Sequence, residues 1–434
     1  MPADHRRTEP KPSTTRRDFI KTTGALAAGA TAAFAISPAV RAAGSDVLRV
    51  GLIGCGGRGT GAAVNALMAD PNTKLVALGD AFRHQLDNSH NALMSNPQVR
   101  DRIVVDEDHK FVGFDAYKGV IDSCDVVCHT TAPHFRPIHL KYAVEKGKHN
   151  FVEKPVATDM PMLREIWETC RVAKQKNLAV VSGLCWRYDP EKRATLQHVL
   201  DGGVGDIVSI ETVYNSGGVW DPRRTREQVG SEMELQMWNW YYYTWLSGDH
   251  IAEQAIHSID KMSWAMGDVA PLRIWGVGGR QVRTDPRYGN IWDHFSIVYE
   301  YPGGVKGYHL CRHWPNTPGG TQDFIMGTKG VADVFGHRVR GENEWRYRGP
   351  RGDMYQIEHD HLFASIRKGD PINDGDYMCM STALSIVGRE AAYTGQIIKW
   401  EDAMNSTTSL APKAYEWGEA PDHPIARPGV TTFA

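Results

Sequence analysis

The sequence predicts an α/β protein with two main domains: an N-terminal Rossmann-type, doubly wound parallel sheet and a C-terminal α/β domain with a largely antiparallel sheet. Between residues 47 and 155, short apolar runs alternate with helix-like segments, the order that gives a parallel sheet covered by helices. From about residue 295 onward, strand-like runs follow one another, with only Gly303-Gly304 between the first two, which is typical of a hairpin.

Composition narrows the class of function. The chain has 434 residues, with 49 Lys+Arg against 51 Asp+Glu and a formal net charge of −2. A general nucleic-acid binder shows a basic excess, so nucleic-acid partners are not expected. Hydrophobic residues make up 41% of the chain, an ordinary value for a globular protein. The length allows two or three domains.

The first element is expected to be an export signal, residues 1–42. A basic start is followed by a Gly/Ala-rich apolar run at 23–36 and by small residues, the layout of a secretory signal. Arg16 and Arg17, followed by an apolar pair and Lys21, resemble the twin-arginine motif. We therefore expect the twin-arginine export machinery as a partner, a periplasmic location and a mature chain outside the membrane. The alternative is a basic helix at the start of a cytosolic protein.

Seven cysteines follow, an odd number, and several lie in apolar strand-like runs. None of them has the spacing of a metal ribbon, although Cys124 and Cys128 come close. We expect mostly buried free thiols rather than a disulfide framework, and no metal site built on cysteine.

A glycine-rich loop predicts dinucleotide binding. The apolar run 47–53 leads directly into a Gly-x-Gly-x-x-Gly motif, and residues 60–67 read as a helix. In this setting Gly54 allows a tight turn, Gly56 lets the backbone approach a pyrophosphate, and Gly59 lets helix and strand pack closely. The loop residues expected at the cofactor are Gly54, Gly56, Gly57, Arg58 and Gly59.

The ends of later strands add further candidates. The second strand ends in Asp80, where a carboxylate accepts hydrogen bonds from an adenosine ribose and repels a 2′-phosphate. NAD is therefore favoured over NADP, although the nearby Arg83 keeps NADP open. Ligands of doubly wound sheets lie beyond the carboxyl ends of the strands. The cofactor residues expected at two further strand ends are Thr131, His134, Glu153 and Lys154.

Together these motifs resemble those of the glucose–fructose oxidoreductase, inositol dehydrogenase and rhizopine-catabolism (Gfo/Idh/MocA) superfamily. The resemblance covers most of the chain and rests on the glycine loop, Asp80, Gly147-Lys148-His149, Glu153-Lys154-Pro155 and residues 327–330. It implies a Rossmann domain, placed at residues 43–170, and a substrate and oligomerisation domain, placed at 171–434. Members act on carbon–oxygen bonds of sugars, cyclitols and other polyols, and often pair through the second sheet, so a homo-dimer or homo-tetramer is expected.

One departure from the family lies after the third informative strand. Many members have Thr-Pro-Asn-His-x-His there. This chain keeps the first histidine as His134 but has Arg136 in place of the second.

Hydride transfer from an alcohol needs a base for the hydroxyl proton and a cation for the developing alkoxide. Lys154 suits the second role, since its family counterpart lies beside the nicotinamide. For the base, residues 247–260 are interpreted as one helix on which Glu253 and His257 share a face. Many members have Asp-x-x-x-His here, so His257 is expected as the acid/base and Glu253 as its partner. The alternatives are a divalent metal on the face shared with His250, and a buried structural histidine network.

Candidate substrate contacts lie in the second half. Arg187 ends an apolar strand where the family often has a substrate-side arginine. Trp240 and Tyr243 belong to an aromatic run, 238–245, that suits the C–H faces and hydroxyls of sugars, or alternatively core packing or a subunit interface. The Pro/Gly-rich segment 219–230 is interpreted as a loop or lid over the site.

The sequence thus predicts an exported NAD(P)-dependent oxidoreductase that acts on a sugar, cyclitol or related polyol and keeps its cofactor bound, because the periplasm has no dependable NAD pool. One alternative is a redox-neutral glycoside hydrolase, in which transient oxidation acidifies a neighbouring C–H and permits elimination of the leaving group. Another is a non-catalytic sugar sensor.

Overall fold

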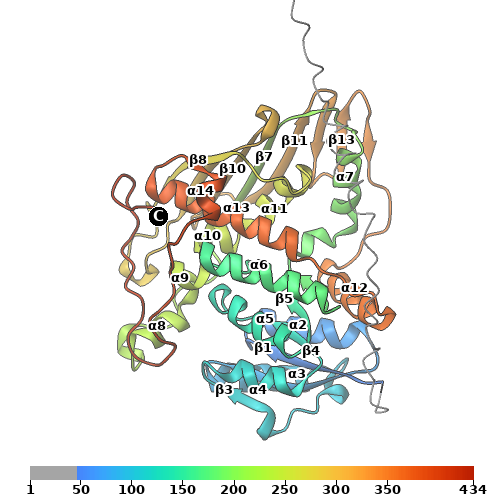
Figure 1. Ribbon diagram of the computed structural model, residues 1–434, viewed down its shortest axis with the longest axis vertical. Helices are drawn as coiled ribbons and strands as arrows, with labels where there is room; N and C mark the ends of the chain where they lie inside the picture. The colour runs from blue at the N-terminus through green and yellow to red at the C-terminus, as the bar shows by residue number, and fades with distance from the viewer. Residues whose placement is uncertain (1–45) are drawn as a thin grey trace, which may run out of the picture. The chain divides into compact units, whose positions relative to one another are not determined.

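The first sheet has six parallel strands in the order β3-β2-β1-β4-β5-β6 (Figure 1). In the computed structural model, which describes residues 46–434, β1 pairs with β2 on one side and β4 on the other. The strands are β1 (Leu48–Ile53), β2 (Thr73–Asp80), β3 (Lys110–Val112), β4 (Val126–His129), β5 (His149–Val152) and β6 (Val180–Ser182). The predicted doubly wound sheet is confirmed. The expected export signal, residues 1–42, lies outside the described residues.

Helices cover both faces of this sheet. One apolar cluster joins it to α2, α3 and α12, and a second joins it to α4 and α5. The helices are α2 (Gly57–Ala69), α3 (Arg83–Met94), α4 (Ala116–Ser123), α5 (Arg136–Glu145), α6 (Met160–Gln175) and α12 (Met354–Lys368). Because α12 packs against α2, a segment far along the chain completes the nucleotide-binding half.

The boundary expected at residue 170 is wrong. It falls inside α6, and the short apolar strand β6 then pairs with β5. A strand of three buried residues cannot leave the sheet without exposing its neighbour's edge, so the first domain extends to about residue 182.

The second sheet has nine strands in the order β14-β13-β12-β11-β7-β10-β9-β8-β15. Only β7 and β10 pair in parallel, so the predicted, largely antiparallel character is confirmed. The strands are β7 (Ile207–Ser216), β8 (Arg273–Gly279), β9 (His294–Glu300), β10 (Lys306–His313), β11 (Gly320–Gly327), β12 (Gly330–Asp333), β13 (Arg338–Gly341), β14 (Trp345–Arg346) and β15 (Ile398–Lys399).

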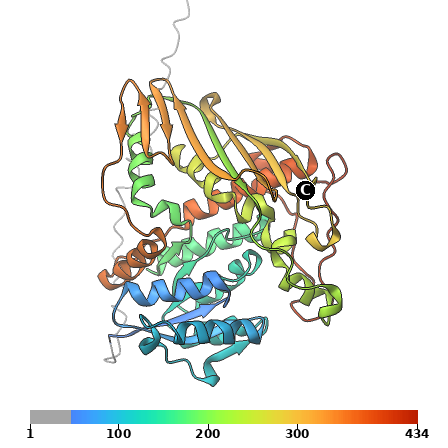
Figure 2. The ribbon, with the colours of Figure 1, turned by 180° about the vertical axis from the view of Figure 1, so that it is seen from behind.

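One face of the second sheet is covered by helices, and the other is open (Figures 1 and 2). Strand alternation turns His309 and Cys311 of β10 inward and leaves Tyr308 and Leu310 exposed. The remaining helices are α7 (Pro190–Leu200), α8 (Glu232–Trp238), α9 (Thr244–Ser247), α10 (Asp249–Glu253), α11 (Ile256–Ala265), α13 (Gly375–Thr394) and α14 (Trp400–Met404). No helix among the described residues is long and apolar enough to span a bilayer.

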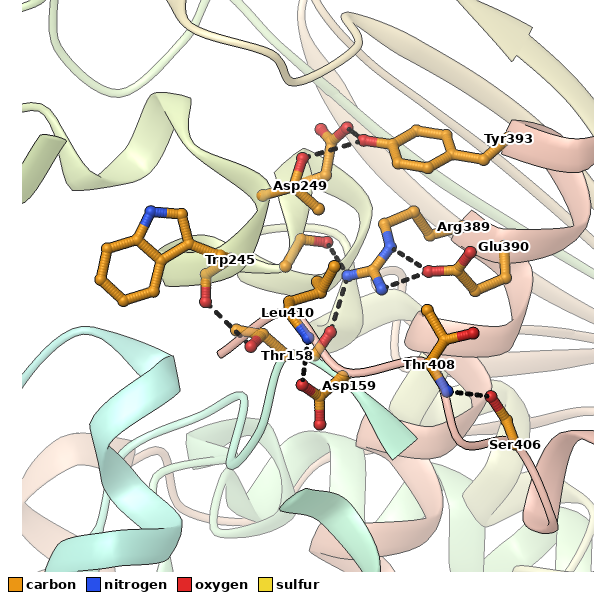
Figure 3. A network of polar contacts seen from close by, with 12 residues as sticks. Thr158, Asp159, Trp245, Asp249, Arg389, Glu390, Tyr393, Ser406, Thr408 and Leu410 are labelled. Carbon is orange, nitrogen blue, oxygen red and sulfur yellow. Dashed lines mark hydrogen bonds and ion pairs between the residues drawn. The ribbon is translucent and has the colours of Figure 1, made fainter. Parts of the chain in front are cut away.

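A buried arginine ties the two domains together. Arg389 of α13 is fully buried, forms an ion pair with Glu390, and donates to the backbone carbonyls of Thr158 (2.9 Å) and Gly248 (3.2 Å). Figure 3 shows this network between the loop after β5 and the start of α10. That loop also carries Lys154, so these contacts fix the position of Lys154 relative to the second domain.

The seven cysteines are buried free thiols, as expected from their apolar surroundings.

Candidate active site

The glycine loop is packed tightly on one side and open on the other. Gly54 has φ +93°, and a Cβ there would lie 2.6 Å from the backbone of Thr130. A Cβ on Gly59 would lie 1.9 Å from the carbonyl oxygen of Gly54, whereas one on Gly56 or Gly57 would have nothing within 4 Å. The open side lies at the N-terminus of α2, which has no side-chain cap. This cradle of backbone N–H groups fits a pyrophosphate.

Asp80 stands in the wall of the same cavity, which has a volume of about 380 Å³. Its carboxylate accepts hydrogen bonds from the backbone N–H groups of Cys55 (2.7 Å) and Phe82 (2.9 Å). Burial raises the pKa of this carboxyl, and the two hydrogen bonds oppose the rise. Both carboxylate oxygens are therefore held in place at the end of β2, where a ribose can reach them.

Residues 219–240, which we call the roof, close this larger cavity from the side of the second domain. The ring of Trp238 stacks on Phe82, with centroids 4.4 Å apart. The roof residues in the cavity wall are Trp220, Arg223, Met237, Trp238 and Trp240. The loop predicted to cover the site is thus confirmed, and it extends into α8.

The C-terminal tail, residues 405–434, braces the roof (Figures 1 and 2). The carbonyl of Gly418 accepts a hydrogen bond from the N–H of Met233 in α8, at 3.0 Å. The ring of Trp417 lies 4.7 Å from that of Phe114, which lines the cavity. The roof and the tail together thus cover part of this cavity.

A smaller cavity of about 290 Å³ adjoins the first. Four residues line both: Arg58, Thr130, Thr131 and Trp240. The other wall residues come from both domains: Arg136, Glu153, Lys154, Gly183, Cys185, Tyr214, Glu253, Gln254, His257 and Tyr355. The cavity at the glycine loop and the cavity at the residues predicted to act as cation and base therefore lie next to each other.

Lys154 is held by Glu253 rather than left free. Its Nζ lies 3.2 Å from Oε1 of Glu253 and also donates to the backbone carbonyl of that residue. The exposed fractions of the two side chains are only 12% and 10%. Gln254 donates to the other carboxylate oxygen. The expected pairing of Glu253 with His257 is therefore wrong in this structure, since both carboxylate oxygens have other partners.

The single helix predicted over residues 247–260 is also wrong. The structure has two helices, α10 and α11, separated by a turn at Gln254 and Ala255. The carboxylate of Asp249 accepts from the N–H of Trp292, which fixes α10 beside β9, whereas α11 packs against β7 and β11. One straight helix cannot follow both directions, so Glu253 and His257 do not share a helical face.

His257 lies in the wall of the smaller cavity in its neutral form. Burial, and then the positive charges of Lys154 and Lys261, lower its pKa well below the ordinary value. Its Nδ1 is buried without a hydrogen-bond partner, which leaves Nε2 to exchange a proton with a ligand. The ring of Trp186 packs at 4.9 Å between it and the ammonium of Lys261.

His250 does not join His257. Its Nδ1 lies 3.0 Å from the hydroxyl of Tyr241, and its ring stacks on His313 at 4.5 Å. Among residues 46–434, no group of three or more His, Cys, Asp or Glu side chains is placed to hold a metal ion. The surroundings of His250 correspond to the buried histidine network considered from the sequence.

Arg58 reaches from the glycine loop to two buried carboxylates. It forms ion pairs with Glu153 and, at 2.8 Å, with Glu358 of α12. Burial and the negative charge of Glu153 raise the pKa of Glu358 well above its ordinary value. Burial also opposes ionisation of Glu153, but the charges of Arg58, Lys154 and Arg136 outweigh it and lower that pKa. The pKa values of these two neighbouring carboxyls are thus shifted in opposite directions.

Three expected contacts lie elsewhere. Arg187 donates to Asp260 at 2.8 Å and to Asp268 at 2.6 and 2.9 Å, so its guanidinium is committed to ion pairs. Tyr243 lines neither cavity. His134 is fully buried, bonded to the hydroxyl of Tyr415 at 2.9 Å, and also lines neither cavity. The remaining expected cofactor residues, and Trp240, line one or both cavities.

Some wall residues were not predicted. Tyr214 of β7 donates to Gln254 at 3.1 Å, and Tyr355 of α12 lies under Arg58 at 4.8 Å. About 140 residues separate Tyr214 from Tyr355 in the chain, and no sequence motif contains either of them. Arg136 did carry a signal, since it replaces a histidine of the family pattern.

The family follows from both halves of the chain. Residues 48–182 match the model of an oxidoreductase family with an NAD-binding Rossmann fold (GFO_IDH_MocA). Residues 193–333 match the GFO/IDH/MocA C-terminal domain. The chain belongs to the Gfo/Idh/MocA family.

Among curated relatives of this Gfo/Idh/MocA protein, a "Glycosyl hydrolase family 109 protein" of Shewanella baltica (strain OS185) is 26% identical and aligns over 83% of each chain. An "Alpha-N-acetylgalactosaminidase" of Shewanella oneidensis is 24% identical with the same coverage.

Solved structures share the fold at low identity. An aldose-aldose oxidoreductase from Caulobacter crescentus, complexed with glycerol, superposes with a TM-score of 0.62 at 18% identity, over 81% of this chain and 99% of that one. A scyllo-inositol dehydrogenase from Lactobacillus casei gives 0.61 at 18%, over 81% and 98%. GenD2 from gentamicin A biosynthesis, solved with NAD, gives 0.60 at 16%, over 81% and 96%.

Proposed function

We propose that this protein is an NAD-dependent oxidoreductase that transfers hydride between a sugar or related polyol and a cofactor that stays bound. One observation carries the proposal: the glycine-loop cavity shares four wall residues with a second cavity, whose wall contains both Lys154 and the neutral His257. Placing a nicotinamide in one cavity thus brings a hydroxyl-bearing substrate to a cation and a base.

The chain's own residues perform the proton chemistry. Bound NAD supplies the hydride acceptor. Lys154, whose ammonium is positioned by Glu253, stabilises negative charge on the substrate oxygen. His257 takes the hydroxyl proton at Nε2, which its lowered pKa permits at neutral pH.

NAD fits this chain better than NADP. Asp80 presents a carboxylate where a 2′-phosphate would lie. Arg83, the cation that kept NADP open, is exposed and pairs with Asp87 at 3.0 Å and Glu107 at 2.7 Å. Its guanidinium already has carboxylate partners, which supports the choice of NAD.

The test starts from the purified mature protein. Heat-released nucleotide is identified chromatographically, and the absorbance band of reduced nicotinamide is then followed as sugars and polyols are added without free cofactor. We expect stoichiometric NAD and a lasting spectral change with one class of polyol. A protein that neither retains nor binds NAD would contradict the proposal.

A second candidate is redox-neutral glycoside cleavage, with oxidation, elimination, water addition and re-reduction on one bound cofactor. The names of the Shewanella relatives favour it. The roof and tail favour it as well, because a cofactor that is re-reduced in each cycle never needs to leave. A chromogenic α-N-acetylgalactosaminide separates the candidates: release of the aglycone with no net change in bound NADH supports glycoside cleavage.

We also propose export by the twin-arginine route, on the strength of Arg16 and Arg17 alone. Replacing both with lysine should leave the protein in the cytoplasm, with the larger apparent mass of a chain that keeps its signal. Unchanged export would argue for another route.

A further inference from the structure

Arg136 is a buried cation at the floor of the smaller cavity. It is the first residue of α5, and only 4% of it is exposed. Its guanidinium donates to the carbonyl of Thr131 at 2.8 Å and to that of Pro155, in the loops that follow β4 and β5. Its Nε has no hydrogen-bond partner. The side chain is therefore fixed by neutral groups beneath the cavity it lines.

The charges around the smaller cavity do not cancel. Three cations line it: Arg58, which pairs with two carboxyl groups; Lys154, which pairs with Glu253; and Arg136. Among the described residues, no carboxylate lies within 4 Å of Arg136. Against these three cations, the described residues that line the cavity include two acidic side chains, Glu153 and Glu253. One positive charge remains, and it belongs to Arg136.

The fold gains no stability from this charge. Burial of an unpaired cation is unfavourable, and it lowers the pKa of Arg136 to about 10, which still leaves the group charged at neutral pH. The N-terminus of α5 adds the positive end of a helix dipole. A neutral glutamine could donate to the same carbonyls without these costs. A residue that breaks several stability rules at once is expected where function needs it.

We propose that Arg136 raises the hydride affinity of the bound nicotinamide. The inference rests on the proposed function, because it places that ring in the cavity above Arg136. The oxidised ring is a cation and the reduced ring is neutral, so a fixed positive charge disfavours the oxidised form. One unit charge within several ångströms, at the effective dielectric of a protein site, changes the ratio of the two affinities by about 10- to 100-fold.

This effect suits a cofactor that stays bound, as proposed above. An enzyme that exchanges NAD can draw oxidation forward through a large pool of the oxidised form. A retained cofactor cannot, so its own hydride affinity must drive oxidation of the alcohol. Lys154 cannot supply this field, since Glu253 offsets its charge.

The test compares how strongly the protein holds the two redox forms. Protein stripped of nucleotide is equilibrated with equal amounts of NAD⁺ and NADH, freed of unbound nucleotide, and heated to release the bound forms for quantification. We expect wild type to be enriched in NADH and Arg136→Gln to lose about 10- to 100-fold of that enrichment. Arg136→Lys, which keeps the charge, should retain most of it.

Lys141→Gln serves as the matched control, because it removes an exposed charge from the same helix and Lys141 lines neither cavity; its enrichment should equal that of wild type. Circular dichroism and total bound nucleotide report whether Arg136→Gln still folds and binds. An unchanged NADH enrichment in a folded, nucleotide-binding Arg136→Gln protein overturns the inference. Failure of wild type to bind either nucleotide overturns the proposed function instead.

Discussion

The two ends of the adjoining cavities are built differently. At the glycine loop, the cavity wall is backbone, and its shape depends on glycine. Gly54 and Gly59 have no room for a Cβ, and Gly56 and Gly57 leave an open cradle. At the other end, the wall consists largely of charged and aromatic side chains from β7, α10, α11, α12 and the loop after β5. A backbone site is specified by adjacent residues, whereas a side-chain site is specified by how distant elements pack.

The first prediction tests the catalytic base, His257, in the wall of the smaller cavity. His257→Ala should lower kcat by about 10²–10⁴-fold while leaving bound NAD unchanged, because the proton acceptor is lost and the cradle is not. Steady-state kinetics and nucleotide content are the measurements. His250→Ala would not serve as a control because that ring is buried with Tyr241; exposed His361→Ala does. Loss of NAD from His257→Ala would show that nucleotide binding at the glycine loop depends on His257, which would contradict this prediction.

The second prediction concerns the cation. Lys154→Met should reduce kcat by about 10²–10³-fold with NAD retained, since stabilisation of the substrate oxygen is removed. Lys141→Met, an exposed lysine paired with Glu165 on the same domain, is the matched control. Near-normal turnover in Lys154→Met would remove this residue from the mechanism.

The third prediction contrasts two glycines in the backbone end. Gly59→Ala should destabilise the protein by about 1–3 kcal/mol and reduce NAD content, because its Cβ meets the Gly54 carbonyl at 1.9 Å. Gly57→Ala should leave the thermal midpoint almost unchanged, since its Cβ meets nothing within 4 Å, and should affect only nucleotide affinity. Equal loss of stability in both variants would refute the description of the loop as closed on one side and open on the other.

The fourth prediction concerns the pH dependence of stability, which Asp249→Asn should change with little effect on turnover. Burial raises the pKa of Asp249 to about 6, against the hydrogen bonds from Tyr393 and Trp292. Because the folded state holds this proton more tightly than the unfolded state, stability should fall as pH rises from about 4 to 6. Asp249→Asn should remove that part of the slope, a change of roughly 3 kcal/mol across the interval. Thermal midpoints measured at several pH values provide the check, and an unaltered slope would exclude Asp249 as its source.

The contrast between local backbone sites and sites made by packing also explains which features could be predicted from the sequence. The order of β and α segments, the glycine loop, Asp80 and Glu153-Lys154 are local patterns, and the structure has the predicted sheets and places these residues on the two cavities. The break between α10 and α11 was not predictable, because Asp249 takes its partner from Trp292, just ahead of β9 and some forty residues later in the chain. Arg187 was misassigned because Asp260 and Asp268, which hold it, lie in a different domain from its strand.

The tail also has a consequence for biogenesis. During synthesis the glycine loop emerges first, α12, which covers α2, emerges some three hundred residues later, and Trp417 and Gly418 follow α12. The Rossmann domain therefore lacks these covering segments until residue 418 has been made. Loading of the cofactor is easiest in that interval, so a chain made where NAD is scarce should mature empty.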